Sequence, residues 1–305
     1  MGGGGADGVM EFLAVWEQKR AGLLLQRSCM DLAQNDISMH RPPLQEERVE
    51  CQFSLQQAQL YHQAHAAMMA RFQALQRARG GGNAIGTAAC LRAYQASLTA
   101  LRVVGTHPCI SDVAGKTMEA SAVALRHART KGGISVKLHM ALRFVRAQAA
   151  QRRRKVVVVS AFRCFLDILS QYLALRGIAF ASFTGAVRGA VRSAQLAQWK
   201  APHSNIDVLL MTTQCGNAGI SLDPDLHPDG RPRTTLVLDV DSRSELNPAT
   251  RAQLLMRWNR RMNDPYQDTR VVSLVVPGTT DEITEYLAAK RRGTARVLGK
   301  KRKAA

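Results

Sequence analysis

The chain has 305 residues, enough for one large hydrophobic core or two modest ones, and 46% of them are hydrophobic. No run approaches the roughly 18 apolar residues of a membrane-spanning helix, and the glycine-rich start lacks the layout of a secretory signal, so we expect neither a membrane protein nor a secreted one. Lys and Arg number 42 against 23 acidic residues, a formal charge of +19 that favours a polyanionic partner, although a basic surface that meets only solvent is the alternative.

The first part of the chain is expected to be a disordered start, residues 1–10, followed by a mainly helical lead-in, residues 11–134. Helical periodicity recurs in three stretches of this lead-in, and Pro42, Pro43 and the glycines at 80–82 break the chain between them. The predicted helices are 12–32, a helix that starts after Ser54, and 90–104, the last of which is ended by Thr106-His107-Pro108.

One strand is expected within the lead-in. Residues 48–53 alternate between apolar and polar side chains, as a half-buried strand does. Ser54 follows and is a suitable N-cap, because its hydroxyl can accept a hydrogen bond from a backbone N–H of the first helical turn. The periodicity of the helix after it places four side chains on one face: Leu55, Ala58, Tyr61 and His62.

From residue 135 to 295 strands and helices alternate. Val156–Val159 is a continuous β-branched run, typical of a strand buried on both faces, and Gly177 is placed to stop the helix that follows it. Such alternation implies right-handed crossovers, so it predicts an α/β domain with a mostly parallel sheet and helices on both faces. The other predicted strands are 179–183, 208–211, 235–239 and 271–276, and the predicted helices are 137–150, 165–176, 190–199, 250–262 and 281–290.

Three short signatures lie in this second part. Each is weak alone, because buried strands, glycine turns and paired arginines occur in many proteins. Their order and spacing carry the interpretation. The signatures are Lys155 to Arg163, with Ser160 ending its apolar run; Thr212 to Leu222, with Gly216 and Gly219; and Asn247-Pro248 with Gln253, Arg257 and Arg260.

With these signatures the chain resembles the Swi/Snf-type DNA-dependent ATPases of helicase superfamily 2, specifically their second, RecA-like lobe. Thr212 to Leu222 is similar to the family's Ser-Thr-x-Ala-Gly-Gly-x-Gly-Ile-Asn-Leu motif, and Gln253 to Arg260 is similar to its Gln-x-x-x-Arg-x-x-Arg motif. The resemblance is specific after residue 135 and fainter between 20 and 134, where it echoes the junction of the two lobes. The chain departs from the family's usual residues at Gln214, Asn217 and Asn259.

The resemblance implies that Arg257 and Arg260 act in catalysis, at a nucleotide cleft between two lobes. Phosphoryl transfer needs cations near the phosphate oxygens, and arginine offers a permanent charge on a planar donor fork. Arginines three residues apart share one helix face, so the two can act together, with Arg260 the better candidate for an arginine finger. On spacing alone, surface ion pairs are the more frequent role of such arginines.

The resemblance also implies which residues border the nucleotide cleft and which contact DNA. Gly216 and Gly219 leave backbone N–H groups free to meet an anion, although a tight turn also requires glycine. Asp239 ends a predicted strand, where open α/β sheets bind ligands, and it can equally cap a loop. Gln253 completes the set at the cleft. The residues expected at DNA are Ser160, Arg163, Gly185, Thr212 and Thr213.

We expect no complete nucleotide site within the chain itself. Gly115-Lys116-Thr117 ends like a P-loop, but Ile110 stands where that motif requires its first glycine, and no buried strand precedes it. No acidic pair at a strand end is expected to hold magnesium. ATP and magnesium are therefore expected only if a separate first ATPase lobe supplies their site, and the chain alone should not hydrolyse ATP.

Other features bear on partners and location. The cysteines are scattered without metal-ligand spacing, so we expect reduced thiols in an intracellular protein and no metal site. Duplex DNA is the expected partner, through basic clusters at 152–155 and 290–303, because an aromatic content of 5% gives little support to single-strand stacking. The tail, residues 296–305, is typical of a nuclear localisation signal and equally of a solvated basic end, through Lys300, Lys301, Arg302 and Lys303.

The expected function is the C-terminal half of a Swi/Snf-type, helicase-like DNA-dependent ATPase that translocates on or remodels DNA, either with a first lobe supplied in trans or as a fragment of a longer protein. The alternative is a non-catalytic DNA-binding or interaction module that kept the fold of this lobe.

Overall fold

A computed structural model describes residues 45–81, 84–110, 135–149, 154–187, 189–201, 204–215, 234–241, 269–287 and 290. All of these residues belong to one compact unit, residues 42–305. Within the described ranges, no helix is long and apolar enough to cross a membrane.

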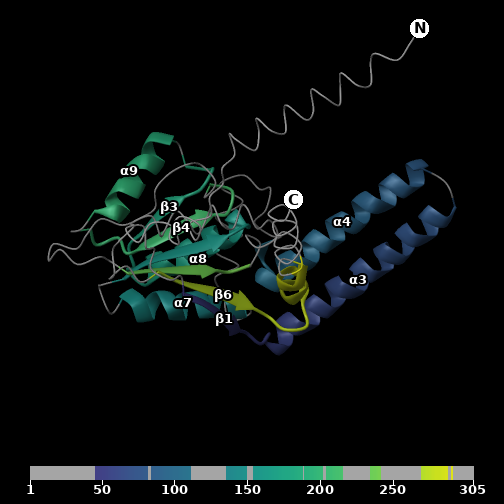
Figure 1. Ribbon diagram of the computed structural model, residues 1–305, viewed down its shortest axis with the longest axis horizontal. Coiled ribbons are helices and arrows are strands. Elements are labelled where there is room, and N and C mark those ends of the chain that lie inside the picture. The colour runs from purple at the N-terminus through teal and green to yellow at the C-terminus, as the bar shows by residue number, and fades with distance from the viewer. Residues whose placement is uncertain are drawn as a thin grey trace, which may run out of the picture. The chain divides into compact units, whose positions relative to one another are not determined.

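The unit is built on a six-stranded sheet in which every strand pairs in parallel with its neighbours (Figure 1). The strand order is β1-β6-β5-β2-β4-β3, so β2 lies inside the sheet and β1 and β3 form its edges. The predicted parallel α/β sheet is therefore confirmed. The strands are β1 (Gln45–Glu50), β2 (Arg154–Ser160), β3 (Phe180–Phe183), β4 (Val208–Thr212), β5 (Thr234–Asp239) and β6 (Thr269–Val275).

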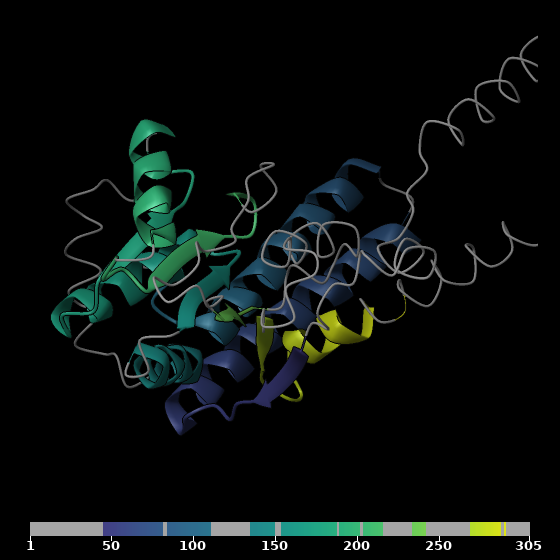
Figure 2. The same ribbon diagram turned by 60° about the vertical axis from the view of Figure 1, so that its left-hand side comes forward.

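Helices cover both faces of the sheet, because alternate residues of the inner strands point to opposite sides. Val156 and Val158 of β2 belong to a core that α7 (Val136–Ala149) and α8 (Arg163–Leu175) complete. Val157 and Val159 belong to a second core on the other face, where α9 (Gly189–Lys200) contributes Trp199 and Leu196. Figure 2 shows the same arrangement from another side.

Gly177 ends α8, as the sequence predicts. Its φ of +65° lies in the left-handed region, which glycine adopts without steric cost. The Gly177 N–H donates to the Ala174 carbonyl (3.1 Å) and the Ile178 N–H donates to the Leu173 carbonyl (3.0 Å), the hydrogen-bond pattern of a Schellman motif. The chain is thereby turned from α8 into β3.

The lead-in adds a strand to the sheet. β1 pairs with β6 from Gln45 opposite Arg270 to Glu50 opposite Val275. It begins and ends three residues before the predicted strand, because the chain turns away after the Cys51 N–H donates to the Val275 carbonyl (2.8 Å). The boundary predicted at residue 134 therefore divides residues that one sheet joins.

Two long helices, α3 (Leu55–Gly80) and α4 (Ala84–Thr106), form a hairpin. They pack against each other through Tyr61, Met68 and Leu101, and the rings of Phe72 and Tyr94 lie 5.4 Å apart. The predicted cap of α3 is confirmed, since the Gln57 N–H donates to Ser54 Oγ (3.2 Å).

The four side chains expected on one face of α3 are not buried together. Tyr61 is buried, but Leu55 is 79% exposed and His62 is exposed. Gln57 is fully buried instead, because its side-chain amide donates to the Val104 carbonyl (3.1 Å) and accepts from the Val136 N–H (3.1 Å). A buried polar residue whose hydrogen bonds go to backbone groups distant in sequence cannot be predicted from the periodicity of apolar residues.

Candidate functional site

The carboxyl ends of the parallel strands meet at one edge of the sheet, where backbone hydrogen bonds join them beyond the strands themselves. The Thr213 N–H donates to the Ser160 carbonyl (3.1 Å), which links the chain leaving β4 to the end of β2. The Val240 N–H donates to the Val159 carbonyl (3.0 Å), which links the chain leaving β5 to the same strand. The end of the first signature and the start of the second thus meet here, beside the end of β5.

One carboxylate organises this edge. Asp241 Oδ2 accepts hydrogen bonds from Ser160 Oγ (2.6 Å) and from the Ala161 N–H (2.7 Å). Ser160 Oγ in turn accepts from the Phe162 N–H (3.0 Å), and Phe162 is the N-cap residue of α8 without a capping side chain of its own. A negative charge beside a helix N-terminus is favourable, because the helix dipole is positive there. Asp241 therefore fixes the turn between β2 and α8.

Asp241 is not among the residues predicted from the sequence. The predicted carboxylate is Asp239, which is buried and lies in register between Val159 of β2 and Ser273 of β6. Asp241 could have been predicted from the Asp239-Val240-Asp241 pattern at the end of a buried strand, because this pattern places a second carboxylate at the same edge of the sheet. Both carboxylates lie where parallel α/β sheets bind their ligands.

The predicted DNA residues fall at two places. Ser160 is fully buried, so its side chain positions the turn and does not face solvent. Thr212 is nearly buried, and the Thr213 hydroxyl is enclosed with no hydrogen-bond partner among the described residues. Gly185 lies apart, in an exposed turn after the edge strand β3.

Arg163 starts α8, and half of its side chain is exposed. Its guanidinium lies 3.8 Å from the carboxylate of Asp167, one turn along the helix. Burial raises the pKa of Asp167 despite the attraction of Arg163, so the arginine only partly compensates the desolvated carboxylate. The guanidinium is the one DNA candidate in this group with an exposed positive charge.

Lys155 does not fit its expected role in a basic DNA-binding cluster. Its side chain is fully buried, its Nζ donates to the Ile206 carbonyl (2.6 Å), and it lies 3.2 Å from Asp207 Oδ1. An ammonium held in this way stabilises the start of β2 and is not available to a phosphate. Residues 152 and 153 lie outside the described ranges.

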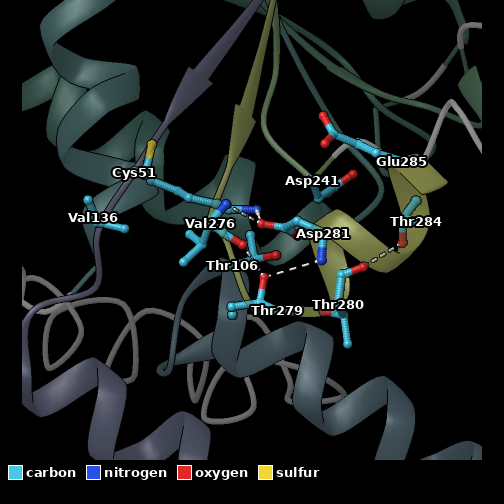
Figure 3. Close-up of polar contacts among 12 residues, drawn as sticks. Cys51, Thr106, Val136, Asp241, Val276, Thr279, Thr280, Asp281, Thr284 and Glu285 are labelled. Carbon is cyan, nitrogen blue, oxygen red and sulfur yellow. Dashed lines mark hydrogen bonds and ion pairs between the residues drawn. The ribbon is translucent and has the colours of Figure 1, made fainter.

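The residues that follow β6 lie at the carboxyl edge of the sheet, next to the hairpin (Figure 3). Asp281 Oδ2 accepts from the Val276 N–H (3.1 Å) and forms an ion pair with Lys137 Nζ (2.7 Å), both side chains being buried. The Thr280 N–H donates to Tyr61 Oη of α3 (2.9 Å). A small pocket remains, with a volume of about 10 Å³, comparable to one water molecule, and is lined by Arg102, Thr106, Phe162, Asp241, Thr280, Asp281 and Thr284.

The residues at this edge do not resemble a metal centre. Among the described residues no three His, Cys, Asp or Glu side chains gather closely enough to hold a metal ion. His107 is buried near the end of α4, where its Nδ1 accepts from the Cys109 N–H (3.1 Å). Burial lowers the pKa of His107 to about 4, so its imidazole is neutral near pH 7 and serves the turn after α4.

Several predicted residues lie outside the described ranges. These are the glycines of the second signature, the residues of the third and the basic tail, and their roles stay predictions: Gly216, Gly219, Gln253, Arg257, Arg260, Lys300, Lys301, Arg302 and Lys303.

No protein-family profile matches the chain. Three curated proteins are similar to parts of it. The chromatin remodeling factor mit1 of Schizosaccharomyces pombe is 28% identical over 144 residues, covering 47% of this chain and 9% of that protein. Protein CHROMATIN REMODELING 5 of Arabidopsis thaliana is 28% identical over 110 residues, covering 36% and 6% respectively. A probable global transactivator of Orgyia pseudotsugata multicapsid polyhedrosis virus is 32% identical over 125 residues, covering 41% and 24%. The chain thus matches less than a quarter of the length of each of these relatives.

Solved structures share the fold. The C-terminal part of the Fun30 ATPase domain superposes with a TM-score of 0.58 at 15% identity, covering 82% of this chain and 90% of that one. The Sulfolobus solfataricus SWI2/SNF2 ATPase core domain gives a TM-score of 0.54 at 16% identity, covering 82% of this chain and 43% of that one. The chain therefore has the fold of the C-terminal, RecA-like lobe of Swi/Snf-type ATPases, and the resemblance seen in its sequence is confirmed.

Proposed function

We propose that this chain acts as the C-terminal half of a Swi/Snf-type, DNA-dependent ATPase and completes a nucleotide site together with a first ATPase lobe. The observation that carries the proposal is the convergence of Ser160, Thr213, Asp239 and Asp241 at the carboxyl edge of a sheet with the fold of such lobes. In open α/β folds this edge is where ligands bind.

Because the sequence contains no P-loop motif, we propose that the two lobes supply different parts of the nucleotide site. The first lobe supplies the phosphate-binding loop and the magnesium site, while Arg257 and Arg260 of this chain reach the nucleotide from the other side of the cleft. Gly216, Gly219 and Gln253 border the same cleft. A planar, permanently charged guanidinium stabilises the charge that develops on the transferred phosphoryl group.

Duplex DNA is the proposed substrate of the motor. The chain's charge of +19 supports a polyanionic partner, and two relatives are named for chromatin remodeling, which supports DNA or nucleosomes and a nuclear location. At the carboxyl edge, the half-exposed Arg163 offers a positive charge for the phosphate backbone. Binding should then be insensitive to sequence and sensitive to salt.

The test is a reconstituted pair of lobes with an Arg260→Lys variant of this chain. Lysine keeps one positive charge but loses the planar fork, so DNA-stimulated ATP turnover should fall by on the order of a thousandfold while DNA affinity stays nearly unchanged. Turnover is measured by phosphate release and affinity by fluorescence anisotropy of a labelled duplex. The chain alone should show no turnover.

Arg251→Lys is the matched control, because it changes a nearby arginine outside the signature and should leave turnover intact. Equal turnover in Arg260→Lys and the parent pair would show that this arginine is not catalytic. Salt-sensitive DNA binding without turnover in any pair would instead favour the non-catalytic module.

A further inference from the structure

The hairpin of α3 and α4 carries charge of only one sign. The chain holds 23 acidic residues, yet none occurs between Glu50 and Asp112, a stretch that contains the whole hairpin. Four arginines of the hairpin are exposed: Arg71, Arg77, Arg79 and Arg92. Its other exposed polar side chains are mostly neutral glutamines, so no acidic group on either helix offsets these charges.

The partners of these four arginines differ from those of the arginines in β1 and β6. Arg48 of β1 pairs with Glu50 and Glu285, and Arg270 of β6 pairs with Glu47. The four hairpin arginines make no ion pair with any residue that the structure describes. Arg77 and Arg79 lie in the last turn of α3, where a positive charge is favourable toward the helix dipole. Arg71 and Arg92 lie inside their helices and have no such role.

The base of the hairpin lies at the candidate functional site. Arg102 and Thr106, near the end of α4, line the pocket that Asp241 and Asp281 also line, and Tyr61 of α3 accepts from the Thr280 N–H. In Figure 1 both helices run away from the sheet from this base. A helix of 26 residues is about 39 Å long, so α3 can follow roughly one turn of a DNA duplex.

We propose that the α3–α4 hairpin is a second contact surface for the phosphate backbone of duplex DNA, in addition to the carboxyl edge. This inference rests on the proposed function, which brings DNA to that edge. An acidic protein surface is the less suitable partner, because protein interfaces are enriched in aromatic and apolar anchors. The exposed apolar side chains of the hairpin are few and are spread along both helices, as Leu55, Met69 and Ile85.

The experiment compares two double variants of the full chain that remove the same charge. Arg71→Gln/Arg92→Gln changes the hairpin, and Arg143→Gln/Arg146→Gln changes two exposed arginines of α7. Affinity for a labelled duplex is measured by fluorescence anisotropy across a series of salt concentrations. Each phosphate contact contributes about 0.9 to the slope of log K against log salt, so the hairpin variant should lose up to about 2 from that slope.

The α7 variant should keep the parent slope, and Arg71→Lys/Arg92→Lys should restore it, since a phosphate contact needs only a positive charge. Equal slopes in the parent and the hairpin variant would overturn the hairpin contact while leaving DNA binding by the chain in place. The same loss in both double variants would overturn it too, because it would show an effect of overall charge. Absence of duplex binding by the parent would overturn the DNA substrate itself. Binding of polyglutamate with the same arginine dependence would assign the surface to an acidic protein.

Discussion

At the scale of single residues, the carboxyl edge depends on the hydrogen bond from Ser160 to Asp241. Both side chains are buried, and Asp241 also holds the Ala161 N–H. A buried donor that loses its acceptor costs about 1–3 kcal/mol, whereas loss of both partners of one bond costs less than the two separate losses. The pair is therefore energetically coupled across a long stretch of chain.

We expect Asp241→Ala to lower the free energy of unfolding by about 2 kcal/mol and Ser160→Ala by about 1 kcal/mol. The double variant should lose at least about 0.5 kcal/mol less than the sum, as measured by urea denaturation. Ser170→Ala, which removes a hydrogen bond to the Asp167 carbonyl within α8, is the control and should be additive with Asp241→Ala. Additivity of Ser160→Ala with Asp241→Ala would contradict the coupling.

At the scale of elements, the buried ion pair between Lys137 and Asp281 joins α7 to the helical turns that follow β6. Lys137 lies in the first turn of α7, and Asp281 accepts from the Val276 N–H at the end of β6 (Figure 3). Removing one partner of a buried pair leaves an uncompensated charge, which costs about 3–5 kcal/mol. The pair thus makes the position of residues 279–287 depend on α7.

Lys137→Met should therefore lower the free energy of unfolding by about 3 kcal/mol, because Asp281 stays buried without its cation. Lys137→Met/Asp281→Asn should recover part of that loss, since the neutral amide needs no counter-charge. Chemical denaturation measures both. The exposed Arg48–Glu50 pair is the control, and Glu50→Gln should change stability by less than about 1 kcal/mol. A Lys137→Met chain as stable as the parent would show that the pair contributes nothing.

The elements that could be predicted from the sequence are those whose residues are apolar over several positions. β2 and β4 are buried on both faces, so their β-branched and aliphatic runs identify them nearly to the residue. β1 is an edge strand with exposed charges at Glu46, Arg48 and Glu50, and its predicted position is three residues late. An edge strand is defined by its pairing with a distant strand, which leaves a weak local pattern.

The candidate site, too, could be predicted only where its residues belong to a local sequence pattern. Ser160 and Thr213 could be selected from the sequence because they belong to short motifs within one stretch of chain, and their role at DNA stays a prediction. Asp241 was missed because its role comes from Ser160, 81 residues earlier in the chain. Lys137 and Asp281 were missed for the same reason, since a buried ion pair between distant segments has no spacing by which a sequence could reveal it.

At the scale of the whole molecule, residues 45–110 of the lead-in and the RecA-like part belong to one compact unit. β1 supplies the edge of the sheet beside β6, and the hairpin supplies the partners of Val136 and Thr280 through Gln57 and Tyr61. A chain that starts at residue 135 loses all of these contacts. It exposes the backbone of β6 as a new sheet edge, and open edges promote association between chains.

We therefore expect residues 135–305 to unfold at a clearly lower temperature than residues 42–305, or to aggregate, whereas 42–305 should unfold at the temperature of the full chain. The reason is that the compact unit begins at residue 42 and that β1 pairs with β6 along its whole length. Circular dichroism during heating measures the midpoint, and size-exclusion chromatography detects association. If residues 135–305 are monomeric and unfold at the same temperature as residues 42–305, then residues 135–305 form an independent domain that does not need the hairpin or β1 for its stability. The contacts at Gln57 and Tyr61 would then carry little of the stability, and the boundary predicted at residue 134 would hold.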